Sequence, residues 1–263
     1  MNKKVIRILA LVLVAVSLFS LCSCDFGGEE DEKIKYARAI PQTKNEILER
    51  LNLVISDVKT QKPAVSYSLD QDAGGADCEN EYVDAAFKTV ANELTQEEFK
   101  QSSEYGQSAK DVFPLMGSEN AAKLEPTDIR SAFITDNLHD RYYVIYVTIY
   151  PEFNPTQDSG VFGKIFKITD DSEIINNFKS VAQFMTFDSY NANYHIGTIK
   201  ATIDKETDHL TKLELHRNVA VDTVITGQGT LATVGTVPLT FNYNSTANYS
   251  MNWDDPSTSK VES

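Results

Sequence analysis

Two histidines on neighbouring predicted strands are the first candidates for chemistry in this chain. If Ile203 pairs with Leu210 across the turn between them, position 195 lies opposite about position 218, and His216 is a near-diagonal neighbour of His195. Two imidazoles with a carboxylate nearby could bind zinc. The spacing matches no zinc motif and a third ligand is not identifiable. Surface histidines on a hairpin are therefore the favoured interpretation, and no metal is predicted.

A serine and a cysteine are the candidate nucleophiles. Residues 106–110 read Gly-Gln-Ser-Ala-Lys, which is similar to the Gly-x-Ser-x-Gly nucleophile elbow but lacks its last glycine and follows no predicted strand. Cys78 stands near a predicted helix start, where a reactive thiol is one interpretation and a small inward-facing residue the favoured one. The chain has no glycine-rich phosphate loop and no recognisable acid/base pair of carboxylates. The sequence therefore predicts neither an enzyme nor a cofactor.

The N-terminus has the three parts of an export signal. Lys3, Lys4 and Arg7 precede an apolar run from Ile8 to Leu21, roughly 14 residues long, which is too short to span a bilayer. The run ends in Leu-Cys-Ser-Cys at 21–24, which resembles the lipobox of bacterial lipoproteins.

That resemblance implies cleavage between Ser23 and Cys24 and a diacylglyceryl group, with palmitate-type acyl chains, on Cys24. Cleavage before Cys22 is a poor alternative because bulky Leu21 would occupy the cleavage position, and an uncut N-terminal anchor is the other alternative. Asp25 implies inner-membrane retention in a Gram-negative cell and nothing in a Gram-positive one. We expect a lipid-anchored protein on the extracytoplasmic face of the cell membrane.

The charge balance limits the partners. The chain carries 24 Lys+Arg against 38 Asp+Glu, a net charge of −14, and a cleaved leader would remove three more positive charges. Nucleic acid is excluded as a partner because phosphate binding needs a positive field. Only Cys78 would remain as a thiol in the mature chain, so no disulfide can staple it and the core must stabilise the fold.

The predicted organisation is a signal peptide (1–23), an acidic tether (24–41), one α+β domain (42–253) and a disordered tail (254–263). A capping box at Thr43–Glu46 begins a helix that ends near Lys59. A strand at 65–69 is followed by a turn at Asp72–Gly75.

Three further helices are predicted: one at 79–94, a short one that begins at Thr95, and one at 171–185. The helix at 79–94 would turn Tyr82, Ala85, Ala86 and Val90 inward. The helix at 171–185 would turn Ile174, Phe178, Val181 and Met185 inward. Strands are expected at 129–135, 141–150 and 161–168, and a long meander at 186–253. The fold class is therefore α+β: a curved antiparallel sheet packed against three to four helices.

Aromatic side chains are concentrated in these strands, and neither face of strand 141–150 looks freely solvated. They form either an ordinary core or an apolar cavity between sheet and helices. The candidate lining of that cavity is Tyr143, Ile145, Val147, Phe178 and Tyr194. In element order and anchor the chain resembles lipoprotein carriers of the LolA/LppX/LprG type, which implies a curved sheet over helices that binds a lipid-like ligand.

A second hypothesis is an interaction domain without a small-molecule ligand. It would dock an envelope protein or a polysaccharide through exposed side chains of the last strands, for which the candidates are Tyr243, Asn244, Asn248 and Tyr249. The sequence does not decide between the two hypotheses.

Overall fold

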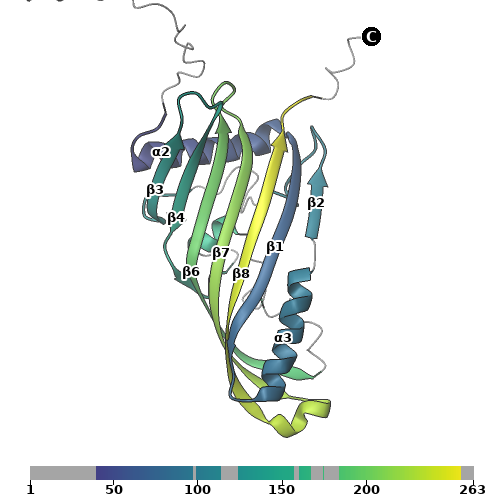
Figure 1. The fold of residues 1–263 in the computed structure, drawn as a ribbon. Helices are drawn as coiled ribbons and strands as arrows, with labels where there is room; N and C mark the ends of the chain where they lie inside the picture. Colours follow the sequence, from purple (N-terminus) through teal and green to yellow (C-terminus); the bar gives the residue numbers. More distant parts are fainter. Residues whose placement is uncertain are drawn as a thin grey trace, which may run out of the picture. The chain divides into compact units, whose positions relative to one another are not determined.

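A computed structural model gives the architecture of residues 40–96, 99–113, 124–156, 160–166, 174 and 184–255, all of which belong to one compact unit, Tyr36–Ser263. Eight strands form one open, curved, antiparallel sheet with helices packed against it, which confirms the predicted α+β class (Figure 1). The strands, in chain order, are β1 (Ala64–Asp77), β2 (Phe99–Ser103), β3 (Ile129–Asp136), β4 (Tyr142–Ile149), β5 (Glu152–Phe153), β6 (Met185–Asp204), β7 (Leu210–Gly227) and β8 (Thr236–Asn252).

Strands β6, β7 and β8 form the long meander that the sequence predicts. Across the sheet the order is β2-β1-β8-β7-β6-β4-β3, and β5 pairs with β6 at one end. The predicted pairing of Ile203 with Leu210 is confirmed, and three register shifts farther along β6 and β7 change the partners of the residues beyond it. A short 3-10 helix, η2 (Gly229–Val234), connects β7 to β8.

Helix α2 (Lys44–Gln61) lies across one face of the sheet near one end (Figure 1). Its predicted capping box is confirmed: the Glu46 amide donates to Thr43 Oγ1 at 3.3 Å, and the Thr43 amide donates to Glu46 Oε2 at 3.0 Å. Lys62 ends the helix in the left-handed conformation. The buried stripe of α2 packs on the inner face of the sheet and consists of Ile47, Leu48, Leu51, Val54, Ile55 and Val58.

Strand β4 shows how the two faces of the sheet differ. Tyr143, Ile145, Val147 and Ile149 are at most 3% exposed and face the helices. The expectation that neither face is freely solvated holds along most of the strand, because Val144 and Tyr146 on the other face are half-buried, whereas Tyr142 at its start is 43% exposed. Side chains alternate between faces along a strand, so a run that is apolar throughout still turns half of its residues outward. The sheet thus has an inner face under the helices and an outer face toward solvent.

Three element predictions are wrong. Asp72–Gly75 is not a turn, because β1 continues to Asp77 and absorbs the glycines in a β-bulge. No new helix begins at Thr95; helix α3 (Glu81–Gln96) runs through it and strand β2 follows. The predicted strand 161–168 is instead helix α4 (Gly160–Ile165), whose first amides are capped by Glu152 Oε1 and Oε2 at 2.7 and 2.9 Å.

Helix α3 only partly shows the predicted inward face. Ala86 packs against the core as predicted and Val83 and Phe87 are buried, whereas Tyr82 is 64% exposed and Ala85 is exposed. The Val90 side chain lies outside the described residues. The Phe87 ring contacts Phe241 of β8 with 5.0 Å between centroids, which sets the rotation of the helix. Of the predicted helix 171–185, Phe178 and Val181 lie outside the described residues, Ile174 is helical and fully buried, and Met185 begins β6.

Candidate functional site

An open hollow of about 590 Å³ on the outer face of the sheet is the candidate site among the described residues, because polar side chains from four strands meet there. Its side chains come from β1, β6, β7 and β8, and its backbone wall from Gly74 and Gly75. We call it the asparagine hollow, and its lining side chains are Asp72, His195, Ile196, Asn218, Asn242 and Asn244.

The floor of the asparagine hollow is a row of hydrogen-bonded side chains across three strands. Asn218, Asn244 and Asp72 are register partners on β7, β8 and β1. The Asn218 amide nitrogen donates to Asn244 Oδ1, and Asn244 Nδ2 donates to Asp72 Oδ2 at 3.1 Å. Each side chain fixes the next, so the floor has one preferred arrangement before any ligand arrives.

Two β-bulges frame this floor. The register of β1 shifts between Gly74 and Asp77, and that of β6 shifts between Tyr194 and Ile196, so that His195 is the extra residue. Gly75 has a φ of +64°, and a Cβ there would meet Asn242 Nδ2 at 3.0 Å. The bulges bend both strands around the floor, which is how a sheet surface becomes a hollow.

One polar atom in the asparagine hollow lacks a partner. Within the described part of the chain, Asn218 Oδ1 is buried and accepts no hydrogen bond. A buried acceptor without a donor costs roughly 1–3 kcal/mol, and a ligand hydroxyl or N–H would recover that cost. The Asn218 side chain as a whole is half-buried, and its amide nitrogen is held by Asn244.

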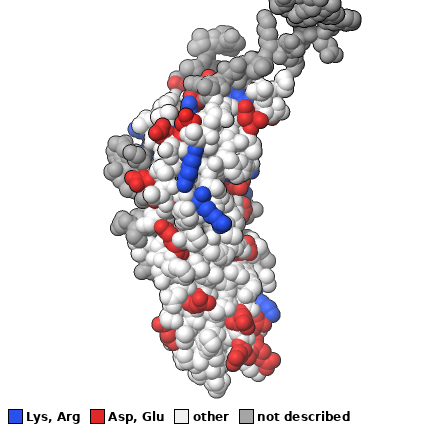
Figure 2. Space-filling view, turned by 90° about the vertical axis from the view of Figure 1, so that its left-hand side faces the viewer, with Lys and Arg blue, Asp and Glu red and all other residues white. Residues whose placement is uncertain are grey.

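The electrostatics of the site are mildly negative. Its lining contains the carboxylate of Asp72 and no lysine or arginine. Figure 2, a view from the left-hand side of Figure 1, shows acidic side chains over both the upper and the lower part of the molecule and basic ones mainly in the upper half. Together with the net charge of −14, this disfavours polyanionic ligands.

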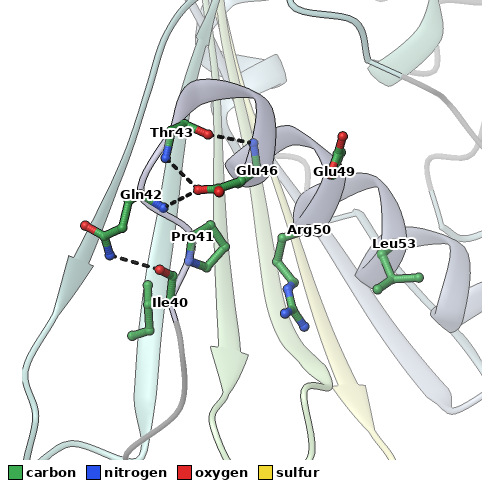
Figure 3. A pocket seen from close by; sticks show the side chains of 8 residues that line it. All are labelled: Ile40, Pro41, Gln42, Thr43, Glu46, Glu49, Arg50 and Leu53. Atoms are coloured by element: carbon green, nitrogen blue, oxygen red, sulfur yellow. Dashed lines mark hydrogen bonds between the residues drawn. The ribbon is translucent and has the colours of Figure 1, made fainter.

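A second depression, of about 500 Å³, lies beside the first turns of α2 (Figure 3). Two of its charged side chains, Glu46 and Arg50, already have partners. Glu46 accepts from the amides of Gln42 and Thr43, which lower the pKa of its carboxyl group, the Thr43 amide most strongly. Arg50 Nη1 pairs with Asp208 Oδ2 at 2.5 Å. These contacts hold the helix start in place and leave little for a ligand to satisfy.

Four of the five predicted cavity-lining residues belong to the core. Tyr143, Ile145, Val147 and Tyr194 are at most 3% exposed, and Phe178 lies outside the described residues. The Tyr194 ring packs edge-on against Phe162 of α4 with 5.1 Å between centroids. The inner face is therefore packed with protein side chains at these four positions.

A cavity of about 90 Å³ lies elsewhere on the inner face, beside the buried side chain of Arg217. Arg217 Nε donates to Ser245 Oγ at 2.8 Å, and the guanidinium lies 5.9 Å from the Tyr194 ring and 5.6 Å from the Tyr243 ring. Burial raises the pKa of the neighbouring Tyr249 hydroxyl, although Arg217 opposes that shift. The remaining lining is apolar and aromatic: Tyr67, Leu69, Leu215, Ala247 and Phe166.

The structure separates the residues that the sequence grouped by chemistry. His216 Nδ1 lies 3.0 Å from Thr246 Oγ1, and His216 is the register partner of Thr198, because the pairing of β6 with β7 shifts by one residue between Thr202 and Ile203. Among the described residues no three His, Cys, Asp or Glu side chains form a metal-binding group. Ser108 Oγ accepts from the Lys110 amide at 3.4 Å in a loop, and Cys78 is half-buried against the core.

The predicted docking residues of β8 divide between the two faces. Tyr243 and Tyr249 are 1% and 4% exposed and face inward, so they cannot dock a partner as predicted. Asn244 and Asn248 face outward, and Asn244 is part of the asparagine hollow. Local sequence patterns did not indicate Asp72, Asn218 or Asn242 as site residues; a signal was available only for Asn242, because asparagines occupy four alternate-face positions of β8, at 242, 244, 248 and 252.

Comparison of this chain with protein families, with characterised proteins and with solved structures returns no match. Among the described helices none has both the length and the apolar character that crossing a membrane requires.

Proposed function

We propose that this chain is an extracytoplasmic lipoprotein, anchored through Cys24, whose folded domain binds a polysaccharide in the asparagine hollow. The single observation that carries the binding role is Asn218 Oδ1, a buried acceptor without a hydrogen-bond partner in the lining of a preorganised hollow. A buried acceptor without a donor destabilises the fold, so a role in ligand binding explains its presence better than a role in stability does.

The lining favours a sugar polymer over a protein partner. Protein interfaces depend on aromatic and arginine anchors in desolvated pockets, and this hollow has neither. It offers amides, a carboxylate and an imidazole, which can each donate to or accept from sugar hydroxyl groups. Ile196 is 44% exposed at the rim and supplies an apolar surface for the C–H face of a sugar ring.

The test is the retention of the full-length chain, in detergent, on insoluble envelope polysaccharide. Asn244→Ala removes the central residue of the floor and should reduce retention about tenfold, the effect of losing a hydrogen bond of about 1.4 kcal/mol. Asn248→Ala is the matched control, because Asn248 lies on the same strand and donates to Asp70 at 3.0 Å outside the hollow. Equal retention of the two variants would contradict the proposal. If the chain captured an envelope protein and did not bind the polysaccharide, a protein partner would be favoured.

The membrane location rests on the lipobox at 21–24 and has its own test. Labelled palmitate should enter the wild-type chain, and Cys24→Ala should accumulate as an unmodified precursor. If the wild-type chain fractionated with membranes but took up no label, the result would contradict a lipid anchor. It would not affect the proposed polysaccharide site.

A second candidate is the lipid-like ligand of the inner face, and the cavity beside Arg217 is the observation that favours it. Sites for small molecules usually enclose about 300–1,000 Å³, so this cavity would take only one end of such a ligand. Native mass spectrometry of the full chain should then find a co-purified apolar molecule. A spectrum of the protein mass alone, together with no uptake of a fluorescent fatty acid, would count against this candidate.

A further inference from the structure

Three exposed apolar side chains lie beside the asparagine hollow on the outer face of the sheet. They are Tyr150, Phe153 and Ile196, which are 47%, 75% and 44% exposed. We infer that this group, the apolar platform, binds ring faces of a polysaccharide whose other rings lie in the asparagine hollow, and this inference rests on the proposed polysaccharide function. Phe153, the most exposed member, is the residue that tests it.

Strand pairing places Phe153 on the outer face. Phe153 of β5 is the register partner of Asn193 of β6, and the preceding pair is Glu152 with Tyr194. Tyr194 is buried on the inner face, where its ring packs against Phe162 of α4. Because side chains alternate between faces along a strand, Phe153 and Asn193 point to the outer face.

Ile196 lies on the same face and close to Phe153. On β7 the register partners of Asn193 and Ile196 are Ala220 and Asn218, so the two β6 residues are two ladder positions apart. Cross-strand neighbours that are offset by two positions are about 7–8 Å apart, which is within reach of an aromatic side chain. Phe153 and Ile196 therefore belong to one patch.

Tyr150 completes the apolar platform just beyond the end of β4. The last paired residues of β4 and β6 are Thr148 and Thr198, and two residues farther on each strand are Tyr150 and Ile196. The Tyr150 amide still donates to the Asp128 carbonyl at 3.3 Å, so the chain remains extended and alternation turns this side chain outward. Single exposed apolar residues are ordinary, but a group of them on one face indicates a binding surface.

The apolar platform is continuous with the asparagine hollow. Ile196 belongs to both, because it also lines the hollow. The row of register partners that begins at Phe153 crosses β6 and β7 and reaches Asn242 of β8, which lines the hollow as well. Three strand spacings separate Phe153 from Asn242, roughly 14 Å. A single sugar ring cannot cover that distance, so the ligand is an oligosaccharide that lies across the strands.

The two parts of the site match the two kinds of surface on a sugar ring. The amides and the carboxylate of the hollow suit the hydroxyl groups at the ring edge, and the platform suits the C–H groups of the ring face. These C–H groups are attracted to the negative face of an aromatic ring. The platform is open to solvent, whereas the aromatic anchors of protein interfaces fill desolvated pockets. A sugar polymer is therefore the occupant that fits both parts.

The experiment measures retention of the full-length protein, in detergent, on insoluble envelope polysaccharide. Phe153→Ala should reduce retention about fivefold, and Phe153→Trp should preserve it because tryptophan keeps an aromatic face. Tyr82→Ala is the matched control, because Tyr82 is 64% exposed on helix α3, which packs on the inner face through Phe87. Both replaced side chains are exposed, so the thermal unfolding of the variants should match that of the wild type.

The tryptophan variant also reports contact directly. Trp253 is the only tryptophan of the chain, and its ring stacks on His209 with 3.9 Å between centroids. His209 is in the turn after β6, roughly 25 Å along that strand from Ile196. Soluble oligosaccharides released from the same polysaccharide should therefore change the fluorescence of Phe153→Trp and leave that of the wild type unaltered.

The outcomes separate this inference from the function on which it rests. If Asn244→Ala weakens retention and Phe153→Ala does not, the apolar platform is overturned and binding in the hollow stands. Equal losses for Phe153→Ala and Phe153→Trp, or unchanged fluorescence of Phe153→Trp with saturating oligosaccharide, also overturn the platform. If the wild-type chain is not retained and instead captures an envelope protein through Phe153, both the inference and the proposed function fail.

Discussion

Arg141 and Asp204 join the start of β4 to the end of β6 through two contacts with one carboxylate oxygen. Arg141 Nε and Nη2 lie 2.6 and 2.5 Å from Asp204 Oδ2, while Asp204 Oδ1 accepts from the Glu206 amide at 2.8 Å. Beside them Lys205, whose side chain is fully buried, contacts Asp136 Oδ1 at 2.5 Å and Asn137 O at 2.7 Å. This cluster ties together the turns at one end of the sheet.

The Asp204 carboxylate should make stability depend on pH. Burial alone would raise the pKa of Asp204, but the hydrogen bonds from Arg141 and Glu206 lower it overall. Because the folded pKa lies below the unfolded value of about 3.9, this stabilisation is complete above that value and is lost as pH falls through the folded pKa. In urea unfolding, Asp204→Asn should be less stable than wild type at pH 7, and the difference should shrink toward pH 2. Asp140→Asn, at an exposed turn position, is the control; a pH-independent difference for Asp204→Asn would contradict the assignment.

Gly197→Ala should destabilise the core. A Cβ at position 197 would lie 2.5 Å from Ile149 Cδ1 and 2.7 Å from the Phe162 ring, both of which are buried. Overpacking of this kind costs about 1–3 kcal/mol in the free energy of unfolding, which chemical denaturation can measure. Gly74→Ala is the matched control, because nothing lies within 4 Å of its Cβ position and the change should leave stability nearly unaltered. Equal effects of the two changes would show that packing at Gly197 is not the constraint.

Two leucines of α2 should differ strongly in their contribution to stability. Leu51 is fully buried on the inner face of the sheet, and Leu51→Ala should cost about 2–5 kcal/mol through lost contacts and the cavity left behind. Leu53 is 52% exposed, and Leu53→Ala should change stability by about 0.5 kcal/mol or less. Thermal unfolding of both variants checks the orientation of the helix, and a larger loss for Leu53→Ala would mean that α2 is rotated.

The capping box of α2 should be measurable through Thr43. Thr43→Ala removes the side-chain acceptor of the Glu46 amide and should lower the free energy of unfolding by about 1 kcal/mol. Thr60→Ala, near the other end of the same helix, should be neutral or slightly stabilising, because alanine has the higher helix propensity and Thr60 is exposed. A neutral effect of Thr43→Ala would show that the helix start is held by other contacts.

Local patterns in the sequence determined much of the framework. Thr43 and Glu46 predicted the start of α2, because a capping box involves residues within one turn of the helix. Alternation over 186–253 predicted the meander, and the turn at 204–209 predicted the pairing of Ile203 with Leu210. The leader and the lipobox are likewise read from contiguous residues.

Tertiary structure decided what depends on residues far apart in the chain. Gly74 and Gly75 indicate a turn locally, yet β8 supplies hydrogen-bond partners on both sides of them, so the chain stays extended and bulges. Residues 161–165 favour a strand locally, yet the carboxylate of Glu152 caps their amides and a helix forms. The asparagine hollow brings Asp72, Asn218 and Asn244 together from three strands, and only the register of the sheet places them in one row. Sequence spacing cannot reveal such a site, because a shift of one residue in any strand would turn its side chain to the opposite face.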